Sequence, residues 1–221
     1  MKSLILSAAL TVGFASNGFA AVLFDNPLVS PTTGGNCAFE CLNSIGAQSF
    51  ELSADSIVES FSFEFLSNDP PSSFLPGIVN WSITTVLDDL PGDTIVSGSS
   101  AFTEAETTAT GNDFNSLYDG YEAQIDIPDQ MLSAGSYFLT LGIDTLDSFN
   151  TYWREGAGNG MAAESSDGGA TWQAGYRNRS NMAITINGVE GITAVPLPAA
   201  LPLLLIGLTG MGLAGRRRAG S

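Results

Sequence analysis

Ser60-Phe61-Ser62-Phe63-Glu64-Phe65 decides the fold of this chain, because three phenylalanines alternate in it with small or charged side chains. Successive side chains of a β-strand point to opposite faces, so all three rings fall on one face. The opposite face is left to polar side chains, which suits contact with water. The stretch therefore predicts a strand of an antiparallel sheet that buries only one of its faces.

The same period of two recurs elsewhere in the chain, between clusters of Gly, Pro, Asn and Asp. It predicts further strands in residues 79–85, 94–96, 121–127, 137–143 and 182–186. The segment Pro-Gly-Asp at 91–93 is expected to form a turn, and Pro128 is expected to end the strand before it. Outside the two chain ends, no segment keeps the period of a helix.

The number and length of these strands point to one fold class. About 170 residues are enough for a single domain with a substantial core. Roughly nine or ten short strands predict an all-β domain of two packed antiparallel sheets, each with one wet face. A jelly-roll-like β-sandwich is the first expectation, and an immunoglobulin-like sandwich is the alternative.

The N-terminus has the three parts of a secretory signal peptide. Met1-Lys2 supplies the positive charge, residues 4–14 supply the apolar stretch, and Gly18-Phe19-Ala20 supplies a small-x-small cleavage site. We expect cleavage after Ala20. Residues 1–20 are therefore assigned to the signal peptide.

The C-terminus carries a second targeting pattern. Val195-Pro196-Leu197-Pro198-Ala199 opens it, an uncharged apolar run follows from 200 to 214, and Arg216-Arg217-Arg218 comes near the end. The run predicts a transmembrane helix at the short end of the usual length, about 17–25 residues. The arginines are expected to stay on the cytoplasmic side. An ordinary tail anchor is the alternative.

Motif, apolar run and basic end, in this order, resemble the PEP-CTERM sorting signal in its VPLPA variant, with Leu197 where the commoner form has Glu. The resemblance implies a protein exported by a Gram-negative bacterium, held briefly in the inner membrane and cut near the motif by an exosortase. It implies a final place at the cell surface or in the extracellular matrix, because the genes of this family are associated with exopolysaccharide production. The chain then divides into 1–20, a β-sandwich domain at 21–192 and a sorting tail at 193–221.

The domain between signal and tail is strongly acidic. It contains three arginines, no lysine and all 23 acidic residues, so its formal charge is −20. Nucleic acid is excluded as a partner, since binding it requires Lys and Arg to neutralise phosphates. Carboxylates are hard oxygen ligands, which makes calcium a candidate structural ion with no position assigned. No other cofactor is expected.

Cys37 and Cys41 are the two cysteines, and both are expected to meet the oxidising periplasm. We expect a local disulfide that closes a small loop. A zinc site is the weaker alternative, because the chain has no histidine. The same absence excludes Ser-His-Asp and Cys-His catalysis.

One segment matches the Asp-box pattern Ser-x-Asp-x-Gly-x-Thr-Trp at every defined position, with Ser165, Asp167, Gly169, Thr171 and Trp172. In this pattern the carboxylate accepts backbone N–H bonds across a tight turn, and glycine supplies the unusual dihedral angles. Asp-boxes are found in sialidases and other carbohydrate-active proteins. A single copy is expected to be a structural hairpin.

Two further sets of residues are candidates for sugar chemistry. Tyr152, Trp153, Trp172 and Tyr176 could stack on sugar rings, and the alternative for the tryptophans is closing the core. The acid pairs 88/89 and 144/147 could act as general acid and nucleophile in glycoside hydrolysis, although adjacent Asp88 and Asp89 are expected beside a turn.

The functional expectation is therefore a non-catalytic surface or matrix protein associated with extracellular polysaccharide. A secreted glycoside hydrolase that uses a carboxylate pair is the alternative from another class. A calcium-stabilised adhesive spacer is the third hypothesis.

Overall fold

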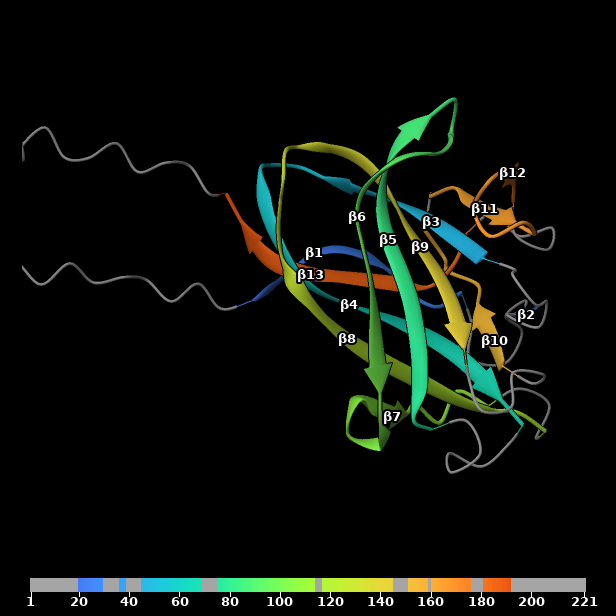
Figure 1. Cartoon of the computed structure of the whole chain (residues 1–221). Helices are drawn as coiled ribbons and strands as arrows, with labels where there is room; N and C mark the ends of the chain where they lie inside the picture. The colour runs from blue at the N-terminus through green and yellow to red at the C-terminus, as the bar shows by residue number, and fades with distance from the viewer. Residues whose placement is uncertain are drawn as a thin grey trace, which may run out of the picture. The chain divides into compact units, whose positions relative to one another are not determined.

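The computed structural model describes residues 20–29, 36–38, 45–68, 75–113, 117–144, 151–158, 160–175 and 181–191 (Figure 1). The predicted sorting motif, the apolar run, the triple arginine and Cys41 lie outside these residues, as does the predicted signal peptide up to Phe19. The described strands belong to a compact unit that ends at Glu190. Its core draws only on residues between 47 and 186.

The described chain is almost entirely β, as predicted, and all its strand pairs are antiparallel. Sheet 1 contains β1 (Ala21–Asn26), β2 (Asn36–Ala38), β4 (Ser56–Ser67), β7 (Thr107–Ala109), β8 (Asp119–Leu132), β10 (Thr151–Arg154) and β13 (Ile184–Glu190). Sheet 2 contains β3 (Ile45–Leu52), β5 (Gly77–Leu87), β6 (Leu90–Phe102), β9 (Gly135–Asp144), β11 (Ala162–Ser165) and β12 (Gln173–Ala174). The helical structure of the described ranges is one 3₁₀ turn, η1 (Glu104–Glu106).

Strand β4, which contains the deciding stretch, is the centre of sheet 1. On one side it pairs with β13 and then with β10, which follow each other along its length. On the other side it pairs with β8, and β7 pairs with β8 in turn. Sheet 2 has the order β12-β11-β3-β9-β5-β6. Figure 1 shows β5, β6 and β9 in front of β4 and β8, so the two sheets form two layers.

The core lies between the sheets. Phe61, Phe63 and Phe65 are at most 1% exposed and point inward from β4. Phe61 meets Trp81 of β5 edge to face, with ring centroids 6.3 Å apart. Aromatic contacts of this kind add to the free energy gained by burying the rings. The three rings therefore face the core, as predicted, in a sandwich-like packing of the two sheets. The opposite side of the stretch is less open to water than predicted, since Ser60 and Ser62 are each 6% exposed.

Two predictions about proline were wrong. The segment 91–93 is not a turn, because it lies within β6, where the register with β5 shifts. The turn is formed by Asp88 and Asp89, whose φ angles are 51° and 64°. A two-residue hairpin turn with two positive φ angles matches the twist of its strands, and Asp tolerates that conformation better than most residues.

Strand β8 also continues through Pro128 to Leu132 instead of ending there. The register with β4 shifts at this point, between the pairs Val58–Gln130 and Ser60–Asp126. A bulge accommodates proline because the missing N–H is not required by the ladder there.

Two buried amides fasten the segments that connect the sheets. Gln48 is fully buried, and its Oε1 accepts a hydrogen bond from the Met182 backbone N–H at 2.6 Å. Asn26 donates to the Met182 carbonyl at 2.7 Å and accepts from the Gly158 N–H at 2.6 Å. These bonds satisfy backbone groups that no sheet ladder reaches. They anchor the chain on both sides of β11 and its hairpin.

Candidate functional site

The outer face of sheet 1 is acidic because the inner face takes the apolar side chains. With Phe63 and Phe65 pointing inward, Glu64 points outward from β4. On β8, burial of Ala123 and Ile125 turns another three side chains outward: Glu122, Gln124 and Asp126. Outward side chains of neighbouring strands lie side by side, so this face gathers carboxylates from β4 and β8.

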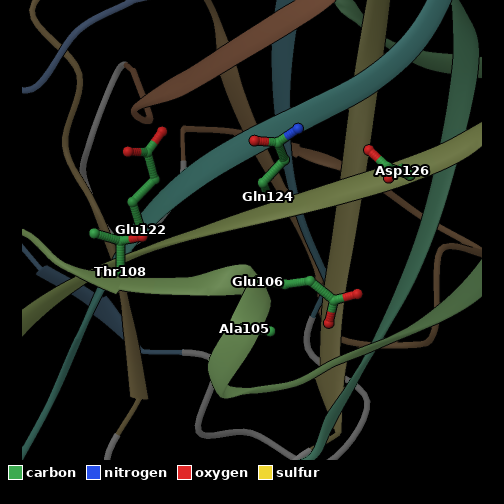
Figure 2. A pocket seen from close by; sticks show the side chains of 6 residues that line it. All are labelled: Ala105, Glu106, Thr108, Glu122, Gln124 and Asp126. Carbon is green, nitrogen blue, oxygen red and sulfur yellow. The ribbon is translucent and has the colours of Figure 1, made fainter.

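Part of this face is hollowed into a groove with a volume of about 220 Å³ (Figure 2). In Figure 2, Gln124 lies between Glu122 and Asp126 along β8, and Glu106 approaches from the turn η1. The lining side chains are Ala105, Glu106, Thr108, Glu122, Gln124 and Asp126. Glu106 is also committed to local structure, since its Oε2 accepts the Thr103 backbone N–H at 2.7 Å in a capping box.

Glu64 and Glu122 are direct partners across β4 and β8. Directly opposed residues have Cβ atoms about 4.5–5.5 Å apart. Ser62 donates a hydrogen bond of 2.7 Å to Oε1 of Glu122. Burial raises the pKa of Glu64, while the charge of Arg154 and a hydrogen bond from Asn112 oppose the rise. Glu64 is the carboxylate on this face that burial most clearly perturbs.

Arg154 is the cation of this face and is completely buried. It follows the inward-facing Trp153 on β10, so it points outward, where the loop containing Asn112 covers it. Its Nη1 donates a hydrogen bond to the Asn112 carbonyl oxygen. Burial lowers the pKa of Arg154, and the charges of Glu64 and Asp113 oppose that change. The arginine thus ties the loop to sheet 1 through charge-assisted contacts.

The outer face of sheet 2 has a different chemistry. Burial of Val79, Trp81 and Ile83 on β5, and of Leu139 and Leu141 on β9, identifies the inner side. The side chains that alternate with them on β5, β6 and β9 point outward and are uncharged: Ile78, Asn80, Ser82, Thr84, Ser97, Ser99, Ala101, Ser136, Phe138, Thr140 and Gly142. We call this set the uncharged face.

Hydroxyl and amide groups of the uncharged face bond to one another across the strands. Ser82 and Thr140 are joined by a hydrogen bond of 2.7 Å between their hydroxyl oxygens. Ser99 donates to the side-chain oxygen of Asn80. The row continues beyond β9 with small side chains, because Thr140 pairs with Ala47 and Ala47 with Ala163. The hydroxyl and amide groups thus lie on β5, β6 and β9, and the row turns apolar and buried at Ala47 and Ala163.

The Asp-box segment connects β11 to β12 as a tight hairpin. Asp167 Oδ1 accepts the Thr171 backbone N–H at 2.9 Å, and its Oδ2 accepts the Thr171 hydroxyl at 2.6 Å. Ser165 Oγ accepts the Gly169 N–H at 2.7 Å, and Gly169 has a φ of 92°. The two bonds from Thr171, together with one of 2.8 Å from the Ser165 hydroxyl, lower the pKa of Asp167 to about 2. The carboxylate is fully engaged in holding the loop.

Trp172 lies at the end of this hairpin and is partly exposed. It packs against a small buried cluster formed by Ala47, Phe138 and Ala163. All three belong to the outer side of sheet 2, since Gln48, Leu139 and Ala162 alternate with them toward the interior. The hairpin therefore places an aromatic ring at the border of the uncharged face.

The structure separates the four aromatic residues predicted as candidates for sugar binding. Trp153 is 0% exposed, and its indole N–H donates to the Ala183 carbonyl at 2.9 Å, so no sugar reaches it in this arrangement. Tyr152 points outward on sheet 1, edge to face with Tyr118 at 5.3 Å. Tyr176 lies outside the described residues. Of the three that lie in the described residues, Trp172 is the one beside sheet 2.

The predicted acid pairs do not form a described site. Asp88 and Asp89 are both exposed at the hairpin turn. Asp144 ends β9 with its backbone opposite Ile78, its side chain is not described, and Asp147 lies outside the described residues. The disulfide expected between Cys37 and Cys41 involves a residue outside them as well. Glu64, Glu122 and Arg154 were missed, because only the pairing of strands brings them together.

Neither a metal-binding cluster nor a membrane-spanning helix is found among the described residues. No three His, Cys, Asp or Glu side chains among them gather where they could hold a metal ion. No helix in the described ranges is both long enough and apolar enough to span a bilayer.

Comparison with known proteins gave no match, either to models of protein families or among curated proteins.

Proposed function

We propose that this chain is an exported protein of a Gram-negative bacterium that ends at the cell surface or in the extracellular matrix. The support is the pattern at its two ends, a signal peptide that ends at Ala20 and a PEP-CTERM-like tail with its motif and basic end between Val195 and Arg218. In this proposal an exosortase cuts the tail near its proline motif after the apolar run has held the protein in the inner membrane. The charge of −20 between the ends suits a soluble domain outside the cell.

We propose further that the domain is a jelly roll. Its eight long strands in chain order are β1, β3, β4, β5, β6, β8, β9 and β13. In sheet 1 the first, eighth, third and sixth of them are neighbours, and in sheet 2 the second, seventh, fourth and fifth. Two sheets that exchange strands in this order make the paired Greek keys of a jelly roll. The short strands β2, β7, β10, β11 and β12 are additions to that frame.

The proposed role is non-catalytic binding of extracellular polysaccharide at the uncharged face, beside Trp172. The observation that carries it is the Asp-box hairpin, which holds a partly exposed indole against the outer side of sheet 2. An aromatic ring stacks on the apolar face of a sugar, while neighbouring hydroxyl and amide groups exchange hydrogen bonds with its edges. Ser82, Asn80 and Ser99 supply such groups on the same surface.

The outer face of sheet 1 is the poorer platform for a polysaccharide that carries carboxylates, because like charges repel. Glu64, Glu122 and Asp126 all lie on it. The uncharged face carries no such penalty.

A titration of residues 21–192 with polysaccharide extracted from the producing bacterium tests this role. We expect saturable binding that Trp172→Ala weakens about tenfold, a loss of about 1.4 kcal/mol. The matched control is Tyr152→Ala, which removes an aromatic ring from the other sheet and should leave binding unchanged. Saturable binding that is equally strong in both variants would place the site elsewhere and overturn the proposal.

One observation favours glycoside hydrolysis as a second candidate. Glu64 and Glu122 are directly opposed, and the pKa of Glu64 is raised by burial, as the pKa of a general acid must be. A retaining glycosidase holds two carboxyl groups about 5 Å apart. Release of reducing ends from the same polysaccharide, abolished by Glu122→Gln, would establish this activity. Binding without release of ends would exclude it for that polysaccharide.

The same titration distinguishes the calcium-stabilised spacer. That hypothesis predicts a melting temperature that rises with calcium and falls with chelator, without saturable polysaccharide binding.

A further inference from the structure

The free edges of the two sheets differ in how well they are protected from pairing with another chain. A sheet edge exposes unpaired backbone N–H and C=O groups, and proteins blunt it with charges, proline, bulges or short strands. Strand β1 carries Asp25 and a register shift, and β12 has only two residues. Strand β8 carries Asp126 and Pro128 beyond the part that pairs with β7, and its register with β4 shifts between Asp126 and Gln130.

Strand β6 is the long edge without this protection. In the described structure it pairs only with β5, at the end of sheet 2. Its register shifts and its proline are confined to residues 91–95, and the pairing from Val96 to Phe102 with Ile83 to Gly77 is regular. This seven-residue stretch, Val-Ser-Gly-Ser-Ser-Ala-Phe, contains no charge and no proline. Ser97, Ser99 and Ala101 are exposed on it.

We infer that residues 96–102 of β6 are a self-association edge that pairs antiparallel with the same residues of a second copy of this chain. A two-fold axis at Ser99 brings Ser99 opposite the Ser99 of the second copy, with Val96 opposite Phe102 and Ser97 opposite Ala101. Such an interface is isologous, and it closes both edges at once. The backbone groups of the two edges are complementary because they belong to the same strand.

Charge decides where two copies of this chain can approach each other. Two domains that each carry −20 repel each other wherever their acidic surfaces meet. The regular part of β6 and the outward residues of β5 beside it, Ile78, Asn80 and Ser82, are uncharged, so two copies approach there with the least repulsion. The nearest acids along β6 are Asp93 before the stretch and Glu104 after it. They meet their like-charged counterparts at both ends of the interface.

The pairing aligns the uncharged faces of both copies in one continuous sheet. Ser99 meets its counterpart directly across the axis, and Asn80, hydrogen-bonded to Ser99 within one copy, lies one strand behind it. Ile78, 44% exposed, pairs with Ala101 one row away. Self-association at β6 does not depend on polysaccharide binding, since it rests on the edge alone.

Sedimentation equilibrium of residues 21–192 tests the inference. The average mass should rise toward twice that of one chain as protein concentration increases. The association should strengthen from about 0.05 to about 0.5 M salt, because salt screens the acids at both ends of the interface. A mass that stays at one chain at every concentration and salt level would overturn the inference.

Substitutions at the axis locate the interface. Ser99→Asp places two carboxylates opposite each other and should weaken association at least tenfold. Ser133→Asp adds the same charge at the exposed turn between β8 and β9 and should leave association unchanged. Melting temperatures of both variants check that each one folds.

A charge-swap mixture separates loss of pairing from loss of folding. Ser99→Lys alone should associate weakly, and an equimolar mixture with Ser99→Asp should form a heterodimer stronger than either variant forms alone. A mixture of Ser99→Asp with Ser133→Lys should not. Equal association of all these samples would exclude β6 as the interface.

Discussion

The outer faces of the two sheets are built on the same alternation, yet they carry opposite kinds of chemistry. The outer face of sheet 1 gathers Glu64, Glu122 and Asp126 over a buried arginine, Arg154. The outer face of sheet 2 presents hydroxyl, amide and small side chains on β5, β6 and β9. The inner faces do not differ in this way, since both contribute aromatic and aliphatic side chains to one core.

Burial in the core constrains the inward positions of both sheets more than the outward ones. An inward position must be apolar to fill the core, so the two sheets become alike there. An outward position is free to vary: Glu64, Glu122 and Asp126 gather on sheet 1, whereas on sheet 2 the acid Glu51 of β3 lies beside Ser136 of the uncharged face. The acidic outer face of sheet 1 favours solubility and repels other acidic surfaces. The uncharged face of sheet 2 can contact a neutral surface.

The largest expected effect concerns the cation of the acidic face. Arg154→Met keeps most of the side-chain volume but leaves Glu64 and Asp113 without their positive neighbour and the Asn112 carbonyl without a donor. We expect a loss of about 3 kcal/mol in the free energy of unfolding, measured by urea denaturation.

The double variant Arg154→Met/Glu64→Gln is the control for that substitution. It removes one of the two stranded charges and should recover part of the loss. Equal stability of the single and the double variant would show that Glu64 and Arg154 are not coupled.

The next effect tests which side of β6 faces the core. A Cβ atom at Gly98 would lie 2.5 Å from Cζ2 of Trp81, so Gly98→Ala should cost about 2 kcal/mol through overpacking. Gly142→Ala is the matched control on the outward side of β9, where the added Cβ would lie 3.6 Å from Ile45 Cγ1, an ordinary contact. Equal losses in thermal unfolding would contradict the assignment of inner and outer faces.

The pKa values of Glu64 and Asp167 are shifted in opposite directions, so the two carboxylates should have smaller, pH-dependent effects on stability of opposite sign. Burial raises the pKa of Glu64 on sheet 1, so the folded state favours its protonated form and its charge opposes folding at neutral pH. Glu64→Gln should therefore raise the melting temperature at pH 7. This gain should shrink as the pH falls through the folded pKa of Glu64 and toward 4.5, the ordinary pKa of a glutamate in the unfolded chain. A gain that stays constant with pH would show that charge is not its cause.

Asp167 on sheet 2 should show the opposite dependence and the smallest effect. Hydrogen bonds from Thr171 and Ser165 lower its pKa to about 2, so its ionised form favours folding. Asp167→Asn should lower the melting temperature above pH 4. The difference from the native chain should disappear between about pH 4 and pH 2, as the native carboxyl becomes protonated in both states. A difference that persists at pH 2 would have to come from side-chain shape.

Much of the fold follows from local patterns. The period of two around Phe63 predicts an inward aromatic row, and the structure buries that row. Local turn chemistry was harder to predict, because a Pro-Gly-Asp segment suits both a turn and a bulge at an edge strand. The position of Pro91 on the edge of a sheet is a property of strand order, which no local window contains.

The candidate site likewise has one part that the local sequence predicts and another that depends on the tertiary structure. The Asp-box is recognisable because all its defined residues lie within one short segment, and its hydrogen bonds close inside that segment. Trp153 and Trp172 look alike in the sequence, since both stand among polar residues in the late part of the chain. Trp153 is buried because it faces the core from β10, whereas Trp172 is partly exposed because the hairpin after β11 places it on the outer side of sheet 2.

Composition and periodicity alone established an acidic all-β domain with an inward aromatic row, because charge and side-chain alternation are properties of each residue and its near neighbours. The pairing of Glu64 with Glu122, the burial of Arg154 beneath the Asn112 loop and the exposure of β6 at an edge depend on which strands become neighbours. Those neighbours are far apart in the chain. They are chosen when the two sheets close over one core, where every apolar side must be covered at once.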